Sequence, residues 1–103
     1  MDNQSAAIAL ESLGNPTRLA LYRSLVRAGP NGLTVGTLRE KLDVPGSTLS
    51  HHIAHLVSAG LMSQSREGRV LRCTANYHSM HELLNYLVDE CCADDPAGDL
   101  NRC

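Results

Sequence analysis

The sequence lacks the large aromatic residues that fill the cores of many small domains: it has no Trp, no Phe and 3 Tyr among its 103 residues. Apolar residues nevertheless make up 43% of the chain, which is typical of a globular protein rather than a disordered one. The core must therefore be built from Leu, Val, Ile and Ala, and a chain of this length predicts one small domain. Small domains with a limited core often gain burial by oligomerising.

Long apolar runs are missing too. No segment approaches the roughly 20 apolar residues that a membrane-spanning helix requires, and the N-terminus lacks the basic and then apolar pattern of a secretory signal. We therefore expect a cytoplasmic protein that does not associate with membranes. The sequence also has no Gly-rich nucleotide loop, no Cys-x-x-Cys motif and no Ser-His-Asp arrangement, which argues against an enzyme.

A net positive charge, which many nucleic-acid-binding proteins have, is absent, since the formal charge is −2. The charges are unevenly distributed, however. Residues 39–72 contain five basic and three acidic residues, whereas residues 89–103 contain five acidic residues and one Arg. An acidic tail thus offsets a mildly basic body, and the local field rather than the total charge decides where phosphate binds.

Caps, chain breakers and apolar spacing predict four helices, a β-hairpin and a last helix. The predicted helices are 4–13, 16–28, 35–42, 47–59 and 77–92, and the predicted strands are 61–65 and 70–74. The tight turn Asp43-Val44-Pro45-Gly46 before the fourth helix is typical of a helix-turn-helix, and Gly60 is expected just beyond the end of that helix. The fold class is therefore mainly α with a β-hairpin (α+β), in a winged helix-turn-helix arrangement.

The fourth helix and the hairpin carry the candidate DNA-binding residues. One face of the helix is apolar and the other bears short polar side chains, which can reach base edges or phosphates in the major groove. Arg side chains on a hairpin suit the DNA backbone or the minor groove. The candidates are Ser47, Thr48, Ser50, His51 and His55 of the helix and Arg66 and Arg69 of the hairpin. His52 lies near the apolar face and is expected to be packed. The alternative is an ordinary solvated surface.

Three segments occur together and in order: Asn15-Pro16-Thr17-Arg18-Leu19, the helix from Ser47 to Leu56, and Ala59-Gly60-Leu61. With this spacing the chain resembles the ArsR/SmtB family of bacterial metal-responsive repressors over roughly residues 5–90. The resemblance implies a winged helix that forms a homodimer through its first and last helices. It also implies binding to double-stranded operator DNA and release by a metal or metalloid.

The sensing sites of that family are not kept in this sequence. The best-known arsenic sensors have a cysteine motif in the helix before the recognition helix, but residues 35–42 contain no Cys. The family's zinc ligands correspond to Asn76, His78, Asp89 and Cys92, so one of the four ligand types remains. A sensing site must therefore lie elsewhere.

Cysteines are concentrated at the end of the chain. Cys91, Cys92 and Cys103 lie within the last 13 residues, whereas Cys73 falls in the second strand of the hairpin and is expected to be a small core residue. Thiolates select soft ions. Trivalent arsenic and antimony accept three sulfurs, whereas zinc requires a fourth ligand. The three terminal cysteines are therefore the candidate metalloid site.

Together these patterns predict a winged helix-turn-helix domain over residues 1–92 and a metalloid-binding tail over residues 93–103. The predicted function is a dimeric repressor that leaves its operator when trivalent arsenic or antimony binds the tail, with no organic cofactor. Two alternatives stay open: a repressor of the same fold that senses thiol oxidation, and a zinc-type metal sensor. Cys103 can reach Cys91 and Cys92 of its own chain or those of the partner subunit, and we favour the arrangement in which it binds across the dimer.

Overall fold

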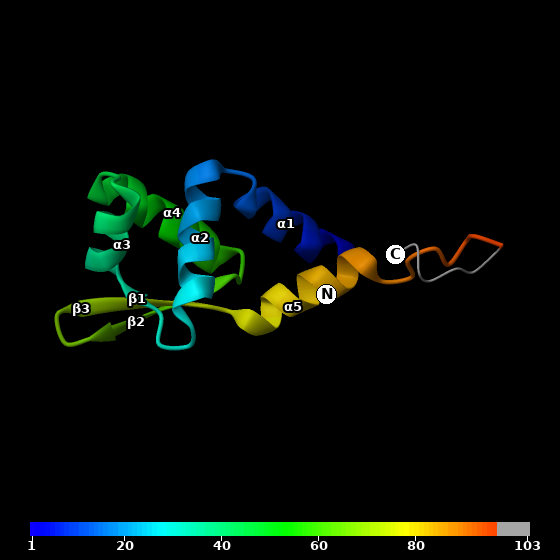
Figure 1. Ribbon diagram of the computed structural model, residues 1–103. Coiled ribbons are helices and arrows are strands. Elements are labelled where there is room, and N and C mark those ends of the chain that lie inside the picture. The colour runs from blue at the N-terminus through cyan, green and yellow to red at the C-terminus, as the bar shows by residue number, and fades with distance from the viewer. Residues whose placement is uncertain (97–103) are drawn as a thin grey trace.

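The computed structural model describes residues 1–96, which form five helices and a three-stranded sheet (Figure 1). The elements are α1 (Asn3–Leu13), α2 (Pro16–Ala28), β1 (Leu33–Thr34), α3 (Val35–Leu42), α4 (Gly46–Ser58), β2 (Met62–Glu67), β3 (Val70–Ala75) and α5 (Tyr77–Val88). The α3–turn–α4 unit followed by the β2–β3 hairpin confirms the winged helix-turn-helix fold. No helix in residues 1–96 is long and apolar enough to cross a membrane.

Side-chain caps define where most of these helices begin. The N-cap side chain accepts a backbone hydrogen bond in α1, α2, α3 and α5, and the caps are Asp2, Asn15, Thr34 and Asn76. In α2 the Asn15 side chain accepts from both Thr17 and Arg18, and Pro16 occupies the first helical position. These contacts satisfy backbone N–H groups that have no partner within a helix, so the start of each helix follows from local sequence.

The end of α4 is a Schellman motif centred on Gly60. The N–H of Gly60 donates to the carbonyl of Val57, and the N–H of Leu61 donates to the carbonyl of Leu56, both at 3.0 Å. Gly60 has a φ of 77°, a left-handed conformation that Gly adopts without a steric penalty. The predicted end of the fourth helix is therefore confirmed.

The sheet is antiparallel with the strand order β1-β3-β2. The hairpin pairs Glu67 with Val70, and Gly68, with a φ of 63°, begins the two-residue turn. The sequence reasoning missed β1, a two-residue strand in which Leu33 pairs with Cys73. A strand this short has no periodicity to recognise.

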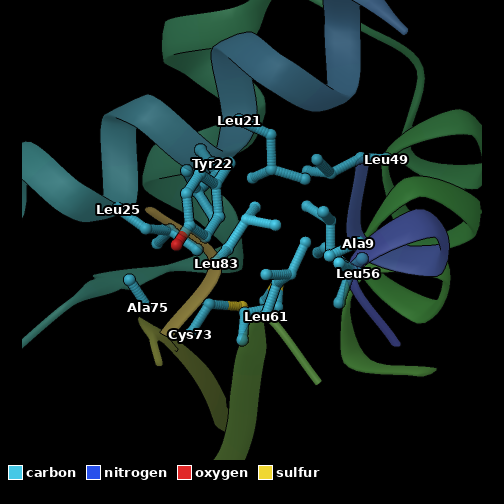
Figure 2. Close-up of a cluster of buried hydrophobic side chains, with 14 residues drawn as sticks. Ala9, Leu21, Tyr22, Leu25, Leu49, Leu56, Leu61, Cys73, Ala75 and Leu83 are labelled. Atoms are coloured by element: carbon cyan, nitrogen blue, oxygen red, sulfur yellow. The ribbon is translucent and has the colours of Figure 1, made fainter. Parts of the chain in front are cut away.

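One apolar cluster joins all five helices with β2 and β3 (Figure 2). Its most enclosed members, each at most 1% exposed, are Ala9, Leu21, Leu25, Leu38, Leu49, Leu56, Leu61 and Cys73. Burial raises the pKa of the Cys73 thiol, which keeps it protonated and unreactive. The expectation that Cys73 is a small core residue is confirmed.

The last helix is shorter than predicted, because α5 ends at Val88 rather than at residue 92. Turns follow in which Cys91 donates its N–H to the Val88 carbonyl, while Glu90 and Cys92 have φ values of 57° and 60°. Two physical reasons apply. Asp89 and Glu90 would place negative charge at the negative end of the helix dipole, and both residues are exposed and gain no core packing from remaining helical.

Candidate functional site

The outer face of α4 carries most of the predicted DNA contacts. Ser47, Thr48, Ser50 and His51 are all exposed. The opposite face is buried in the core, with Leu49 and Leu56 at 0% and Ile53 at 3% exposure. The helix is therefore held from behind while its short polar side chains face outward, which is the arrangement that a helix needs to enter a major groove.

The N-terminus of α4 differs from those of the other helices. Its N-cap is Pro45, which makes no side-chain hydrogen bond to the first turn. The guanidinium of Arg39 lies close by, since a Cβ placed on Gly46 would be 3.5 Å from Arg39 Cζ. Free N–H groups, the positive end of the helix dipole and an Arg side chain together suit a DNA phosphate. The sequence analysis did not predict this position for Arg39. The feature that could have indicated it is a basic residue in the last helical turn of α3, just before the turn that leads into α4.

The wing presents two exposed Arg side chains. Arg66 and Arg69 are exposed on the hairpin, and among the ion pairs within residues 1–96 neither has an acidic partner. Arg72 is different, because its Nε donates to Glu67 Oε1 at 2.6 Å and its Nη1 to the Asn31 carbonyl at 3.0 Å. Glu67 is thus neutralised by Arg72, so Arg66 and Arg69 keep their charge available to DNA.

Behind the outward face, α4 is bound to the α1–α2 corner through His52. This side chain is 8% exposed and Arg18 is 9% exposed. Arg18 Nη1 lies 3.4 Å from His52 Nδ1, and Arg18 Nε donates to the Ser12 carbonyl at 2.6 Å. Burial lowers the pKa of His52, and the Arg18 charge lowers it further. The expectation that His52 is a packed, hydrogen-bonded residue is confirmed.

His55 also turns toward α1. It is half-buried, its Nδ1 lies 2.9 Å from the Ser12 hydroxyl, and its Nε2 lies 3.9 Å from Glu11 Oε2. His55 therefore makes its polar contacts with α1, while its ring also lies 6.4 Å from the ring of His51 on the outward side of α4. Its prediction as a DNA contact stays untested.

The thiol region begins directly after α5. The sulfurs of Cys91 and Cys92 lie 3.9 Å apart, both residues are half-buried, and Cys91 is disulfide-bonded. The left-handed φ at Cys92 replaces the helical geometry that would direct neighbouring side chains about 100° apart. Cys103, the third predicted ligand, lies outside the described residues. Within residues 1–96, no three His, Cys, Asp or Glu side chains are grouped so that they could hold a metal ion.

Comparison with known sequences identifies relatives of the whole domain. A family model described as a helix-turn-helix domain matches residues 13–64. The nodulation protein NolR of Rhizobium meliloti is 30% identical over 88 residues, covering 85% of this chain and 70% of NolR. An uncharacterised HTH-type transcriptional regulator of Methanocaldococcus jannaschii is 32% identical over 87 residues, covering 84% of this chain and 82% of that protein.

Solved structures agree with these relatives. A protein described as an ArsR family transcriptional regulator superimposes with a TM-score of 0.74 at 24% identity, over 87% of this chain and 90% of the other. The chain belongs to the helix-turn-helix family of transcriptional regulators. Another similar structure, described as a possible transcriptional regulator for arsenical resistance, has a TM-score of 0.67 at 25% identity, over 77% of this chain and 79% of the other.

As a helix-turn-helix transcriptional regulator, the chain is a DNA-binding protein and not an enzyme. Two of the residues that correspond to zinc ligands in the ArsR/SmtB family, Asn76 and His78, make contacts within the chain. Asn76 caps α5 by accepting from the Ser79 N–H and donates to the Gly60 carbonyl at 3.0 Å. His78 lies 3.0 Å from Glu82 on the same helix. These contacts account for both side chains without a metal ion.

Proposed function

We propose that this regulator is a homodimeric repressor of the ArsR family that binds operator DNA through α4 and the wing. Trivalent arsenic or antimony, bound by Cys91, Cys92 and the partner subunit's Cys103, releases it. The observation that carries the proposal is the pair of sulfurs 3.9 Å apart immediately after α5. In their reduced form, two thiolates this close can bind one soft ion. The likeness to a possible regulator for arsenical resistance supports the choice of ion.

Exposed apolar residues on the first and last helices support dimerisation. Ile8 and Leu10 of α1 are 48% and 44% exposed, and Leu84, Leu87 and Val88 of α5 are 53%, 55% and 60% exposed. Because about half of each side chain is exposed, its burial in an assembly contributes roughly 1 kcal/mol, about half of the value for complete burial.

The start of α1 meets the last turns of α5, where the Tyr86 hydroxyl is 3.0 Å from Asn3 Oδ1, and the two helices diverge from there (Figure 1). An apolar cavity of about 340 Å³ continues this surface between α2 and α5, with Leu19 and Leu84 in its lining. A second copy of the chain would cover Leu10 and the exposed residues of α5 and extend over this cavity. Ile8 lies instead next to α4, in a pocket that His51 and His55 also line.

Coupling between the two sites follows from the position of the cysteine pair. Cys91 lies three residues beyond Val88, and Val88 belongs to the proposed dimer surface. Ligation of the pair would impose one geometry on the turns that now end α5, and would thereby change how the two α5 helices pack. Because the spacing of the two α4 helices must match successive major grooves, a small change in the dimer lowers operator affinity.

The experiment is a titration of the protein–operator complex with arsenite, antimonite and zinc under reducing conditions, followed by fluorescence anisotropy. We expect arsenite or antimonite to weaken operator binding at least tenfold, whereas zinc has little effect. Cys91→Ser, Cys92→Ser and Cys103→Ser should each bind the operator normally and lose the response. Cys73→Ala is the matched control and should keep it. A complex that survives saturating arsenite and antimonite would contradict the proposal.

A second candidate trigger is oxidation, and one observation favours it: Cys91 is disulfide-bonded in the structure. In this version a peroxide oxidises two thiolates to a disulfide, is itself reduced to water or an alcohol, and so alters the end of α5. Release of the operator by peroxide, reversed by dithiothreitol and independent of metalloid, would favour this trigger over the first.

A further inference from the structure

A buried polar cluster, made of Ser12, Arg18, His52 and His55, joins the inner side of α4 to the end of α1. Two of its three contacts are made by Ser12, which is 0% exposed. The Ser12 carbonyl accepts from Arg18 Nε at 2.6 Å, and the Ser12 hydroxyl lies 2.9 Å from His55 Nδ1. Arg18 then reaches His52 through Nη1 at 3.4 Å. One residue of α1 is therefore connected to two points on α4.

The geometry of these contacts determines which ring nitrogen of His52 accepts a hydrogen bond and restricts the rotation of α4. Arg has donors and no acceptor, so His52 Nδ1 must be the accepting nitrogen and the proton of the neutral ring must be on Nε2. His52 and His55 are three residues apart on one helix and therefore lie on the same side of it. Two polar contacts one turn apart fix the rotation of α4 about its axis more closely than apolar packing does, because hydrogen bonds depend on direction as well as distance.

We infer that Ser12, Arg18, His52 and His55 are positioning residues, which set the rotation of α4 and hence the direction in which its outer side chains enter the DNA groove. His55 acts on DNA binding through Ser12, without touching DNA itself. The inference rests on DNA binding through α4 and is independent of any metalloid response. It also supplies a direct connection between α1, a helix of the proposed dimer surface, and the helix that reads DNA.

A double-mutant cycle on operator affinity tests the inference, with Ser12→Ala, His55→Ala and the double variant. Ser12 is fully enclosed and cannot reach DNA, and Ala fills nearly the same volume, so the fold is retained. We expect each single variant to bind the operator about fivefold more weakly, the order of effect of losing one net hydrogen bond. The double variant should be no weaker than the single variants, because both remove the same contact.

Three further measurements separate positioning from general destabilisation and from direct DNA contact. Affinity is measured well below the melting temperature of each variant, where every chain is folded. His55→Asn, whose side chain can still bond to Ser12, should restore most of the affinity. The dependence of affinity on salt should keep its slope in His55→Ala, whereas loss of a phosphate contact would reduce that slope by about one.

The control is Ser24→Ala on α2, whose hydroxyl donates only to the Ala20 carbonyl one turn back; it should leave affinity unchanged. Full affinity in Ser12→Ala would overturn the inference, as would additive losses in the double variant or no recovery in His55→Asn. These outcomes are separate from the metalloid titration, because a variant with weakened operator binding can still release DNA when arsenite is added.

Discussion

The two ends of the molecule, the inner face of α4 and the last turn of α5, differ in how far their apolar side chains are buried. At the DNA-binding end, the residues of α4 that face inward are enclosed, with Leu49 and Leu56 at 0% exposure. At the other end, the last turn of α5 has little covering, since Leu87 and Val88 are 55% and 60% exposed. The first end is fixed by the chain's own core, whereas the second has no comparable packing within the described residues.

This contrast explains how one fold can serve different signals. A DNA-reading helix must keep its orientation, and α4 is held by core packing and, in our inference, by the polar cluster behind it. Under the proposed function, a sensing segment placed beyond the core can change sequence without unfolding the domain. The cysteine pair lies in that outer segment, at the point where α5 has already ended.

The largest expected effect comes from matched Leu→Ala changes at the two ends. Leu56→Ala should lower the free energy of unfolding by about 2–5 kcal/mol, because it leaves a cavity in the core. Leu87→Ala should lower it by less than about 1 kcal/mol at low protein concentration and should weaken the dimer instead. Urea denaturation at several protein concentrations, with analytical ultracentrifugation, distinguishes the two. Equal losses of unfolding free energy in Leu56→Ala and Leu87→Ala would contradict the difference in packing between the two ends.

A smaller effect is expected from the wing. Arg69→Gln and Arg66→Gln should each weaken operator binding up to about tenfold and reduce the slope of log affinity against log salt by about one, as expected for loss of one phosphate contact. Ser24→Ala on α2, whose hydroxyl donates to the Ala20 carbonyl, is the control and should change neither quantity. An unchanged salt slope in both wing variants would argue that the wing does not touch the DNA backbone.

The smallest effect concerns pH. Burial and the Arg18 charge lower the pKa of His52 below its usual value of 6.5, so the unfolded chain binds a proton more readily than the folded one. Stability should therefore be complete above about pH 6.5 and should fall as the pH decreases through the window between the unfolded and folded pKa values.

The pH effect is measured as the urea midpoint at pH 7.5 and pH 5.5. His52→Gln, which cannot be protonated, should show a smaller decrease than the wild type. His78→Gln is the control, because the His78 side chain is 84% exposed, and it should behave as the wild type does. A wild-type midpoint that does not change with pH would contradict the role assigned to His52.

Most of the fold was predictable because its signals are local. Asn15 with Pro16 marks the start of α2, and Gly60 marks the end of α4; each works through hydrogen bonds within a few residues. The outward direction of Ser47, Thr48, Ser50 and His51 follows from helical periodicity alone.

The features that sequence reasoning missed depend on contacts between distant segments or on their absence. Ser12 and His55 are 43 residues apart in sequence, so periodicity could not show that His55 turns inward. The early end of α5 follows from the lack of core packing after Val88, which apolar spacing does not reveal. Arg39 gains its place beside α4 only when the turn brings the two helices together.

The enclosed thiol of Cys73 can be used as an internal probe of how often the core opens. Its side chain is 0% exposed and its pKa is raised by burial, so an alkylating reagent modifies it only when the core opens. The rate of that reaction under native conditions reports how often the domain unfolds, in the same sample in which operator binding is measured. A ligand that binds only the folded dimer must slow the modification of Cys73 by the factor with which it stabilises the fold.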